Sequence, residues 1–207
     1  MKNQQTIARN IISALDNSGL FHSVKLISSV ANGSFVALSD IDILVSNTAR
    51  TPKENVELAS RIIESHVGVL IKGWSLSLLP NKYLLHHFLP NTSLFWWIDI
   101  SCLPASTDQP LHRNDIDECP NTHIATLWVM NAKHMLRGNT QRLKIKALHQ
   151  KVFDQNTMQL TDISAFISVY QSIDFSKLPQ HFHEQCQAIL EQLLNSSNTS
   201  LLSTMNT

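Results

Sequence analysis

The chain has 207 residues, of which 43% are hydrophobic and 15% are charged. This composition suffices for a packed core and excludes a chain that is disordered as a whole. Lysine plus arginine and aspartate plus glutamate number 16 each, so the formal net charge is zero. Because proteins that bind a nucleic-acid backbone usually carry a basic excess, this balance disfavours a polymeric nucleic-acid substrate.

The cysteines indicate a reducing compartment. There are three, far apart in the sequence: Cys102, Cys119 and Cys186. They show neither zinc-ligand spacing nor a disulfide framework, so we expect free thiols in a cytoplasmic protein. The first residues lack the apolar core of a signal peptide, and no apolar run approaches the length of a membrane span. We therefore expect no membrane partner.

Two amphipathic helices are predicted in the first part of the chain. Over residues 3–18 apolar side chains recur at helical spacing, and Gly19 follows as a C-terminal cap. The second helix begins at Thr51-Pro52-Lys53-Glu54, where threonine is the N-cap, proline suits the first turn and glutamate closes a capping box. This helix is predicted to end before Gly68.

Five strands are predicted in the same part, over residues 23–30, 41–46, 69–79, 83–89 and 94–103. The last strand contains the run F-W-W-I-D-I-S, in which Asp99 faces the side opposite Ile98 and Ile100. Isolated acids seldom lie inside apolar runs without a partner, so Asp99 is expected in a polar site. The alternative is an acid near the strand end that points to solvent.

His86 and His87 are consecutive on a predicted strand, so one points to each face of the sheet. The favoured interpretation is a hydrogen-bonded histidine in the core. The alternative is that one of the two lines a functional cleft.

The second part of the chain is predicted to be helical. Residues 104–121 are rich in Pro, Asp, Asn and His, a composition typical of a linker. Helices are predicted over residues 122–137, 141–153, 161–173 and 178–194, and a Ser/Asn/Thr-rich tail from about 195 is expected to fray. The composition shift near residue 110 predicts an α/β part over 1–110 and an all-α part over 111–207.

The most informative pattern is residues 26–45, L-I-S-S-V-A-N-G-S-F-V-A-L-S-D-I-D-I-L-V. Asp40 and Asp42 are two positions apart on a predicted strand, so they point to the same side of the sheet. Side by side, each would disfavour ionisation of the other unless a cation lay between them. Their hard oxygen ligands suit Mg²⁺, which also bridges nucleotide phosphates. The alternative is that these acids flank a turn.

This segment resembles the signature of the DNA polymerase β-like nucleotidyltransferase superfamily. That signature is an apolar strand, a Gly-Ser pair, a further Gly, and Ser-Asp-x-Asp on the next strand. Here Ser28-Ser29 stands at the Gly-Ser pair, Gly33 at the later Gly, and Ser39-Asp40-Ile41-Asp42 at the last element, with the spacing of the small bacterial members. Residues 127–139, L-W-V-M-N-A-K-H-M-L-R-G-N, are similar to a helix of the aminoglycoside- and lincosamide-type enzymes. A core helix with a glycine cap is the alternative.

The resemblance implies an α/β (α+β) fold with a short mixed sheet flanked by helices, followed by a C-terminal helical region. It also implies a two-metal Mg²⁺ site held by the catalytic acids Asp40, Asp42 and Asp99. Asp99 would be a metal ligand, a general base toward the acceptor hydroxyl, or both. The implied nucleotide-binding residues are Ser28, Ser29 and Gly33 at the phosphates, with Ser39 orienting the acids.

The implied reaction is transfer of a nucleoside monophosphate from an NTP, with ATP expected, to a hydroxyl of a small molecule. That molecule would be an aminoglycoside or lincosamide antibiotic in a resistance enzyme, and residues 111–207 would wall its site. Two alternatives stay open. One is a toxin–antitoxin-type nucleotidyltransferase that modifies a protein or tRNA. The other is a catalytically lapsed nucleotide-binding module, which Ser28 in place of glycine would favour.

Overall fold

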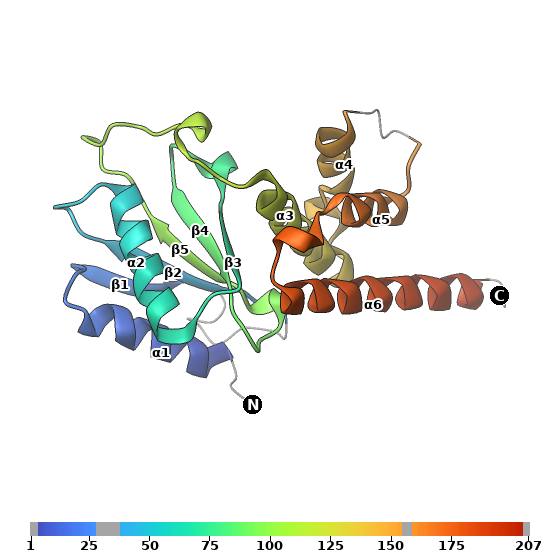
Figure 1. The fold of residues 1–207 in the computed structure, drawn as a ribbon, viewed down its shortest axis with the longest axis horizontal. Helices are drawn as coiled ribbons and strands as arrows, with labels where there is room; N and C mark the ends of the chain where they lie inside the picture. The colour runs from blue at the N-terminus through green and yellow to red at the C-terminus, as the bar shows by residue number, and fades with distance from the viewer. Residues whose placement is uncertain (1–3, 28–37, 155–158, 205–207) are drawn as a thin grey trace. The chain divides into compact units, whose positions relative to one another are not determined.

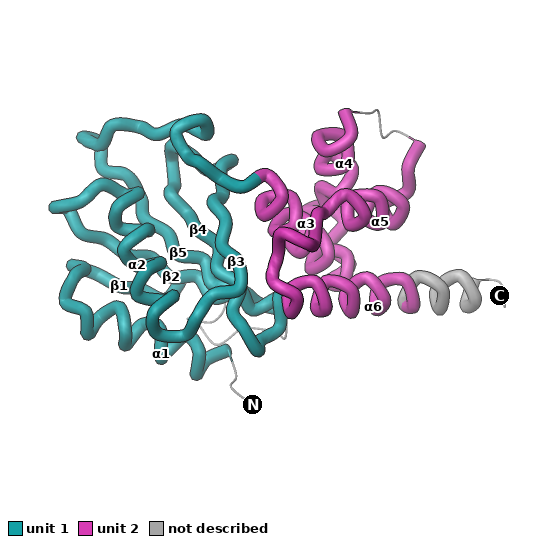
Figure 2. Tube along the Cα trace, in the orientation of Figure 1, with its two compact units in different colours: residues 1–119 teal, residues 120–207 magenta. Residues whose placement is uncertain are grey.

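The computed structural model describes residues 4–27, 38–154 and 159–204, with the side chains of 196–204 left out. The chain divides into two compact units, residues 1–119 and 120–207, which are coloured separately in Figure 2. The first unit contains the sheet and the second is helical, and each is described by itself.

A five-stranded mixed sheet forms the centre of the first unit (Figure 1). Its strands are β1 (Ser23–Ile27), β2 (Ile41–Ser46), β3 (Ile71–Trp74), β4 (Tyr83–Phe88) and β5 (Ile98–Cys102). They lie in the order β1-β2-β5-β4-β3. The central pair, β2 and β5, is parallel, and the other neighbouring pairs are antiparallel. A late strand therefore lies beside an early one in the middle of the sheet.

Helices α1 (Gln4–Asn17) and α2 (Pro52–Val67) cover one face of this sheet (Figure 1). The apolar side chains of the helices and of alternate strand positions form one buried cluster, which includes Ile11, Ile43, Ile63 and Ile100. Since strand side chains alternate between faces, Asp42 and Asp99 belong to the opposite face. The packing of the helices thus decides which side of the sheet carries the acids.

The predicted capping box at the start of α2 is confirmed. Thr51 Oγ1 accepts a hydrogen bond from the Glu54 backbone N–H at 3.3 Å, and Glu54 Oε2 accepts one from the Thr51 N–H at 2.8 Å. Pro52 occupies the first turn, and Gly68, with φ of +73°, follows the helix. Helix α2 therefore begins after Thr51 and ends before Gly68, as the sequence predicts.

Two predicted strands are shorter than expected. The strand predicted over 69–79 is β3 followed by the 3₁₀ helix η1 (Leu76–Leu78), and the strand predicted over 94–103 begins with the 3₁₀ helix η2 (Leu94–Trp96). In η2 the Ser93 hydroxyl accepts a hydrogen bond from the Phe95 N–H at 3.2 Å, which favours a tight turn over an extended backbone. The strand that carries Asp99 therefore starts at Ile98.

The described residues of the second unit form four α-helices, which are α3 (Pro120–Leu136), α4 (Ile145–Phe153), α5 (Asp162–Ser172) and α6 (Gln180–Thr204), and two short 3₁₀ helices. Its core contains Trp128, fully buried, which stacks on Phe166 at a centroid distance of 4.4 Å and donates its indole N–H to the Phe166 carbonyl. The last helix continues to Thr204, beyond the predicted end at 194. The sequence from 195 to 204 contains neither Gly nor Pro, the residues that most readily end a helix.

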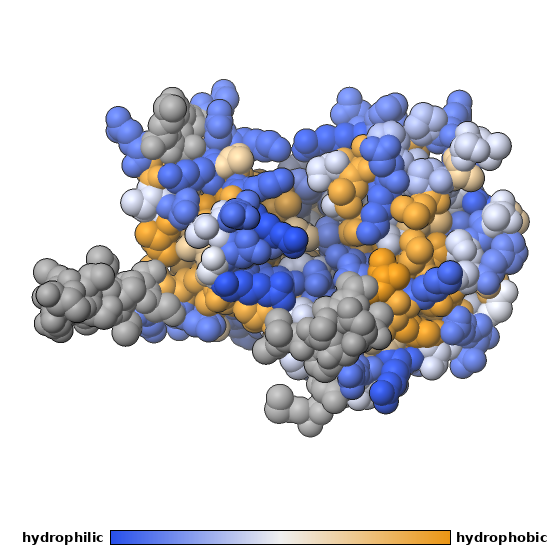
Figure 3. All heavy atoms as spheres, turned by 180° about the vertical axis from the view of Figure 1, so that it is seen from behind, coloured by the Kyte–Doolittle hydropathy of each residue, from blue (hydrophilic) through white to orange (hydrophobic). Residues whose placement is uncertain are grey.

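The predicted fold class is confirmed: the chain is α+β, with a short mixed sheet flanked by helices and followed by a helical region. This is the arrangement that the resemblance of residues 26–45 implies. None of the helices in the described ranges is both long and apolar enough to span a bilayer. Hydrophilic and hydrophobic side chains are interspersed over the face drawn in Figure 3.

Candidate metal centre

The central parallel strands bring Asp42 and Asp99 side by side. In the register of β2 and β5, Asp42 is the direct partner of Asp99, and Ile41 and Ile43 are the partners of Ile98 and Ile100. Side chains at partnered positions point to the same face, so the two carboxylates are immediate neighbours on the face away from α1 and α2. Asp42 is half-buried and Asp99 is buried.

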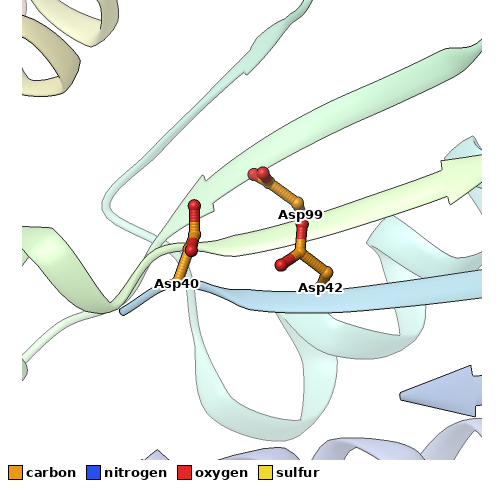
Figure 4. A group of neighbouring side chains, drawn as sticks. All are labelled: Asp40, Asp42 and Asp99. Atoms are coloured by element: carbon orange, nitrogen blue, oxygen red, sulfur yellow. The ribbon is translucent and has the colours of Figure 1, made fainter. Parts of the chain in front are cut away.

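Asp40 lies just before β2, and its carboxylate completes the cluster. Asp40, Asp42 and Asp99 each offer a carboxylate oxygen such that these atoms all lie within 4.8 Å of one another. Figure 4 shows the three side chains projecting to the same side of the sheet, two from the β2 segment and one from β5. The structure thus brings together the three acids that the sequence singles out, and Asp99 does not point into bulk solvent.

A buried histidine contacts the cluster. His86 on β4 is the register partner of Asp99, and its Nδ1 lies 2.6 Å from Asp99 Oδ1. His86 is absent from the predicted site, although the sequence left open that one of the two histidines lines a cleft. Side chains alternate along a strand, so His86 and His87 lie on opposite faces of the sheet. Which of the two lies beside Asp99 depends on the register between β4 and β5.

His87 points to the other face of the sheet. Its Nε2 lies 2.9 Å from the hydroxyl of Ser60 on α2, and the residue is fully buried. This is the predicted hydrogen-bonded core histidine. Burial away from water lowers the pKa of His87 to about 4, so the imidazole is neutral near neutral pH.

The backbone before Asp40 is held by the first helix. The buried side chain of Gln4 donates from Nε2 to the carbonyl oxygen of Ser39, which is itself buried. The sequence resemblance implies an orienting role for Ser39 next to the acids. The structure adds Gln4, for which no sequence pattern gives a signal. Together they fix the point at which the chain enters β2.

Three predicted nucleotide-binding residues, Ser28, Ser29 and Gly33, lie outside the described residues. In the second unit, Lys133 of α3 is buried and Arg137, which follows that helix, is exposed. The sequence similarity of residues 127–139 therefore falls on a helix whose buried side chains include Trp128 and Lys133.

The donor set of the acidic cluster fits a divalent cation. Mg²⁺ binds oxygen ligands at roughly 2.0–2.1 Å, so two oxygens on one ion lie at most about 4.2 Å apart. The 4.8 Å bound on the carboxylate oxygens lies within a small side-chain adjustment of that geometry. Three carboxylates without a cation would also repel one another. The residues present are therefore suited to hold Mg²⁺ or Mn²⁺.

No known protein-family profile matches the chain, and no characterised protein sequence does. Among solved structures, the polymerase core of TRAMP, an RNA surveillance complex, is similar at 10% identity and a TM-score of 0.36, over 94% of this chain and 59% of that chain. A chain of the GLD-2/RNP-8 complex is similar at 12% identity and a TM-score of 0.35, over 91% and 74%. The chain thus spans less than two thirds of the TRAMP polymerase chain. The candidate site is assigned from the geometry of Asp40, Asp42 and Asp99 in this protein.

Proposed function

We propose that the protein is a Mg²⁺-dependent nucleotidyltransferase that moves a nucleoside monophosphate from an NTP, ATP in the first instance, to a hydroxyl group and releases pyrophosphate. The observation that carries this proposal is the convergence of Asp40, Asp42 and Asp99 on one side of the parallel strands β2 and β5. The Ser-Asp-x-Asp pattern at residues 39–42, which contains two of these acids, also supports it.

The three acids have distinct positions in the proposed site. Asp40 and Asp42 leave the same strand segment, and Asp99 faces them from β5, so the carboxylates can bind a cation from two sides. Bound Mg²⁺ would offset the negative charge of the triphosphate and lower the pKa of the attacking hydroxyl. Asp99 is also the proposed acceptor of the hydroxyl proton. Ser28, Ser29 and Gly33, in the segment between β1 and β2, are proposed to bind the phosphates.

We propose a small molecule as the acceptor, of the aminoglycoside or lincosamide type. The zero net charge supports this choice, because an enzyme that acts on tRNA or another polynucleotide usually carries a basic surface. Residues 111–207 are proposed to contribute to acceptor binding. The alternative acceptor is a protein or tRNA. With such an acceptor the proposed chemistry at the metal site would be the same.

The proposal is tested by transfer of label from α-labelled ATP in the presence of Mg²⁺. The acceptor panel contains aminoglycosides, lincosamides, tRNA and the protein itself. With the acceptor that is labelled, Asp42→Asn and Asp99→Asn are expected to reduce turnover at least about a hundredfold, because each removes a metal ligand. Asp16→Asn, at an exposed acid of α1, serves as the matched control and should retain activity.

Turnover near the wild-type level in Asp42→Asn, with the protein folded, would contradict the metal assignment. Label on tRNA or on a protein in place of the small molecules would retain the proposed chemistry and replace the proposed acceptor. Circular dichroism of each variant establishes that the fold is retained.

A further inference from the structure

One row of side chains crosses the sheet through the proposed metal centre. The partners in register are Asp42 on β2, Asp99 on β5 and His86 on β4, so the imidazole stands on the far side of Asp99 from Asp42. The side chains of His86 and Asp99 are 6% and 10% exposed, and His86 Nδ1 lies 2.6 Å from Asp99 Oδ1. At this distance and burial the contact is a strong hydrogen bond.

The direction of this hydrogen bond follows from the chemistry of the two groups. An ionised carboxylate only accepts hydrogen bonds, so Nδ1 of His86 donates to Oδ1 of Asp99. An aspartate side chain has two rotatable bonds, Cα–Cβ and Cβ–Cγ, so the orientation of the Asp99 carboxylate depends on its contacts. A buried donor on one side of the carboxylate fixes its plane and leaves oxygen lone pairs for a ligand on the side of Asp40 and Asp42.

We propose that His86 is a positioning residue that holds Asp99 in the orientation required to bind the divalent cation. This inference rests on the proposed function, because it assigns His86 a part in the same metal centre. His86 does not contact the cation. It acts through Asp99, so its loss should weaken cation binding even though all three carboxylates are still present.

The chain provides a matched control at the next position. His87 is also buried on β4 and also hydrogen-bonded, but to Ser60 on the opposite face of the sheet. Replacement of either histidine removes one buried hydrogen bond from the same strand. Only replacement of His86 removes a contact to a proposed metal ligand, so the two variants separate a positioning role from a general contribution to folding.

The experiment measures Mn²⁺ binding to the metal-free full-length protein by electron paramagnetic resonance, without nucleotide. In His86→Leu the Mn²⁺ dissociation constant is expected to rise roughly ten- to a hundredfold, the range typical for loss of an outer partner of a metal ligand. His86→Asn keeps an N–H donor at the same distance along the side chain and should restore the affinity to within about threefold of the wild type. His87→Leu is expected to lower the melting temperature and leave the Mn²⁺ affinity unchanged.

If His86→Leu does not fold, His86→Met takes its place with the same expected loss, since methionine adapts to irregular space in a core. Unchanged Mn²⁺ affinity in a folded His86 variant that lacks the donor would overturn the inference, as would equal weakening by His87→Leu. The variant Asp42→Asn distinguishes failure of the proposed metal site from failure of the proposed role of His86. If Mn²⁺ binds the wild type and Asp42→Asn equally well, the proposed metal site itself is wrong; if only the His86 effect is missing, the proposed function stands without it.

Discussion

Asp42 and Asp99 are partners across two parallel strands, and carboxylates at directly opposed positions destabilise a sheet. The structure places the Asp40 carboxylate beside them and the imidazole of His86 against Asp99. The hydrogen bond from His86 to Asp99 partly offsets the repulsion among the three carboxylates. A divalent cation bound by all three carboxylates would offset this repulsion.

The free energy of unfolding is expected to depend on pH through His87, which lies in the core and not in the proposed metal centre. Burial lowers the pKa of His87 from 6.5 to about 4, while Glu64 and the backbone of Ile98 act in the opposite direction and Lys72 and His86 in the same one. Below pH 6.5 the unfolded chain binds a proton at this residue that the native protein does not bind. The contribution of neutral His87 to the free energy of unfolding is thus complete above pH 6.5 and falls by about 3 kcal/mol as the pH drops to about 4.

Urea denaturation of the wild type and of His87→Gln, at a series of pH values between about 7 and about 4, tests this expectation. Glutamine retains a hydrogen-bonding side chain but does not titrate, so the variant should lose less stability on acidification than the wild type. His86 is present in both proteins, and its contribution cancels in the difference. Identical pH profiles would show that His87 binds protons equally well in the native and unfolded states, which would contradict a lowered pKa.

At the scale of the elements, the pairing of the strands decides which residues form the site. The sequence predicts that Asp40 and Asp42 share a face and that Asp99 opposes its apolar neighbours, because alternation within a strand is local. The order β1-β2-β5-β4-β3, which makes Asp99 the partner of both Asp42 and His86, depends on contacts between distant parts of the chain. Alternation alone places His86 and His87 on opposite faces without indicating which one meets Asp99.

Short apolar runs set a second limit on prediction from the sequence. Leu94–Trp96 forms a 3₁₀ helix although it continues directly into the apolar residues of β5. Periodicity does not distinguish a buried strand from another buried segment over so few residues. Helix α2, by contrast, is predicted accurately at both ends, because Thr51, Pro52, Glu54 and Gly68 each have a local conformational preference.

The capping box of α2 gives the prediction that belongs to this scale. Thr51→Ala removes the hydroxyl that accepts from the Glu54 N–H and donates to Glu54 Oε2. The free energy of unfolding is expected to fall by about 1 kcal/mol, the usual effect of losing an N-cap side chain. Chemical denaturation measures the change, and Thr107→Ala, at an exposed loop position, is the control. An unchanged midpoint in Thr51→Ala would mean that the cap does not contribute to the stability of the first unit.

At the scale of the whole molecule, the composition predicts an α/β part over residues 1–110 followed by a helical part. The two compact units of the structure are residues 1–119 and 120–207. The composition shift near residue 110 marks the end of the strands, whereas the unit boundary falls at 119–120. The reason is that the segment after β5 returns to the sheet: the Leu111 N–H donates to the Tyr83 hydroxyl at 3.0 Å, and Leu111 packs against the apolar cluster. Such a return depends on tertiary contacts that composition does not encode.

We propose that Asp40, Asp42 and Asp99 together bind a divalent cation. Crystals of the protein soaked in Mn²⁺ and measured at a wavelength where manganese scatters anomalously test it most directly. We predict an anomalous peak on the face of β2 and β5 away from α1 and α2, with carboxylate oxygens of the three acids roughly 2.0–2.3 Å from the ion. A map in which these carboxylates are ordered and Mn²⁺ is bound only elsewhere would contradict the account.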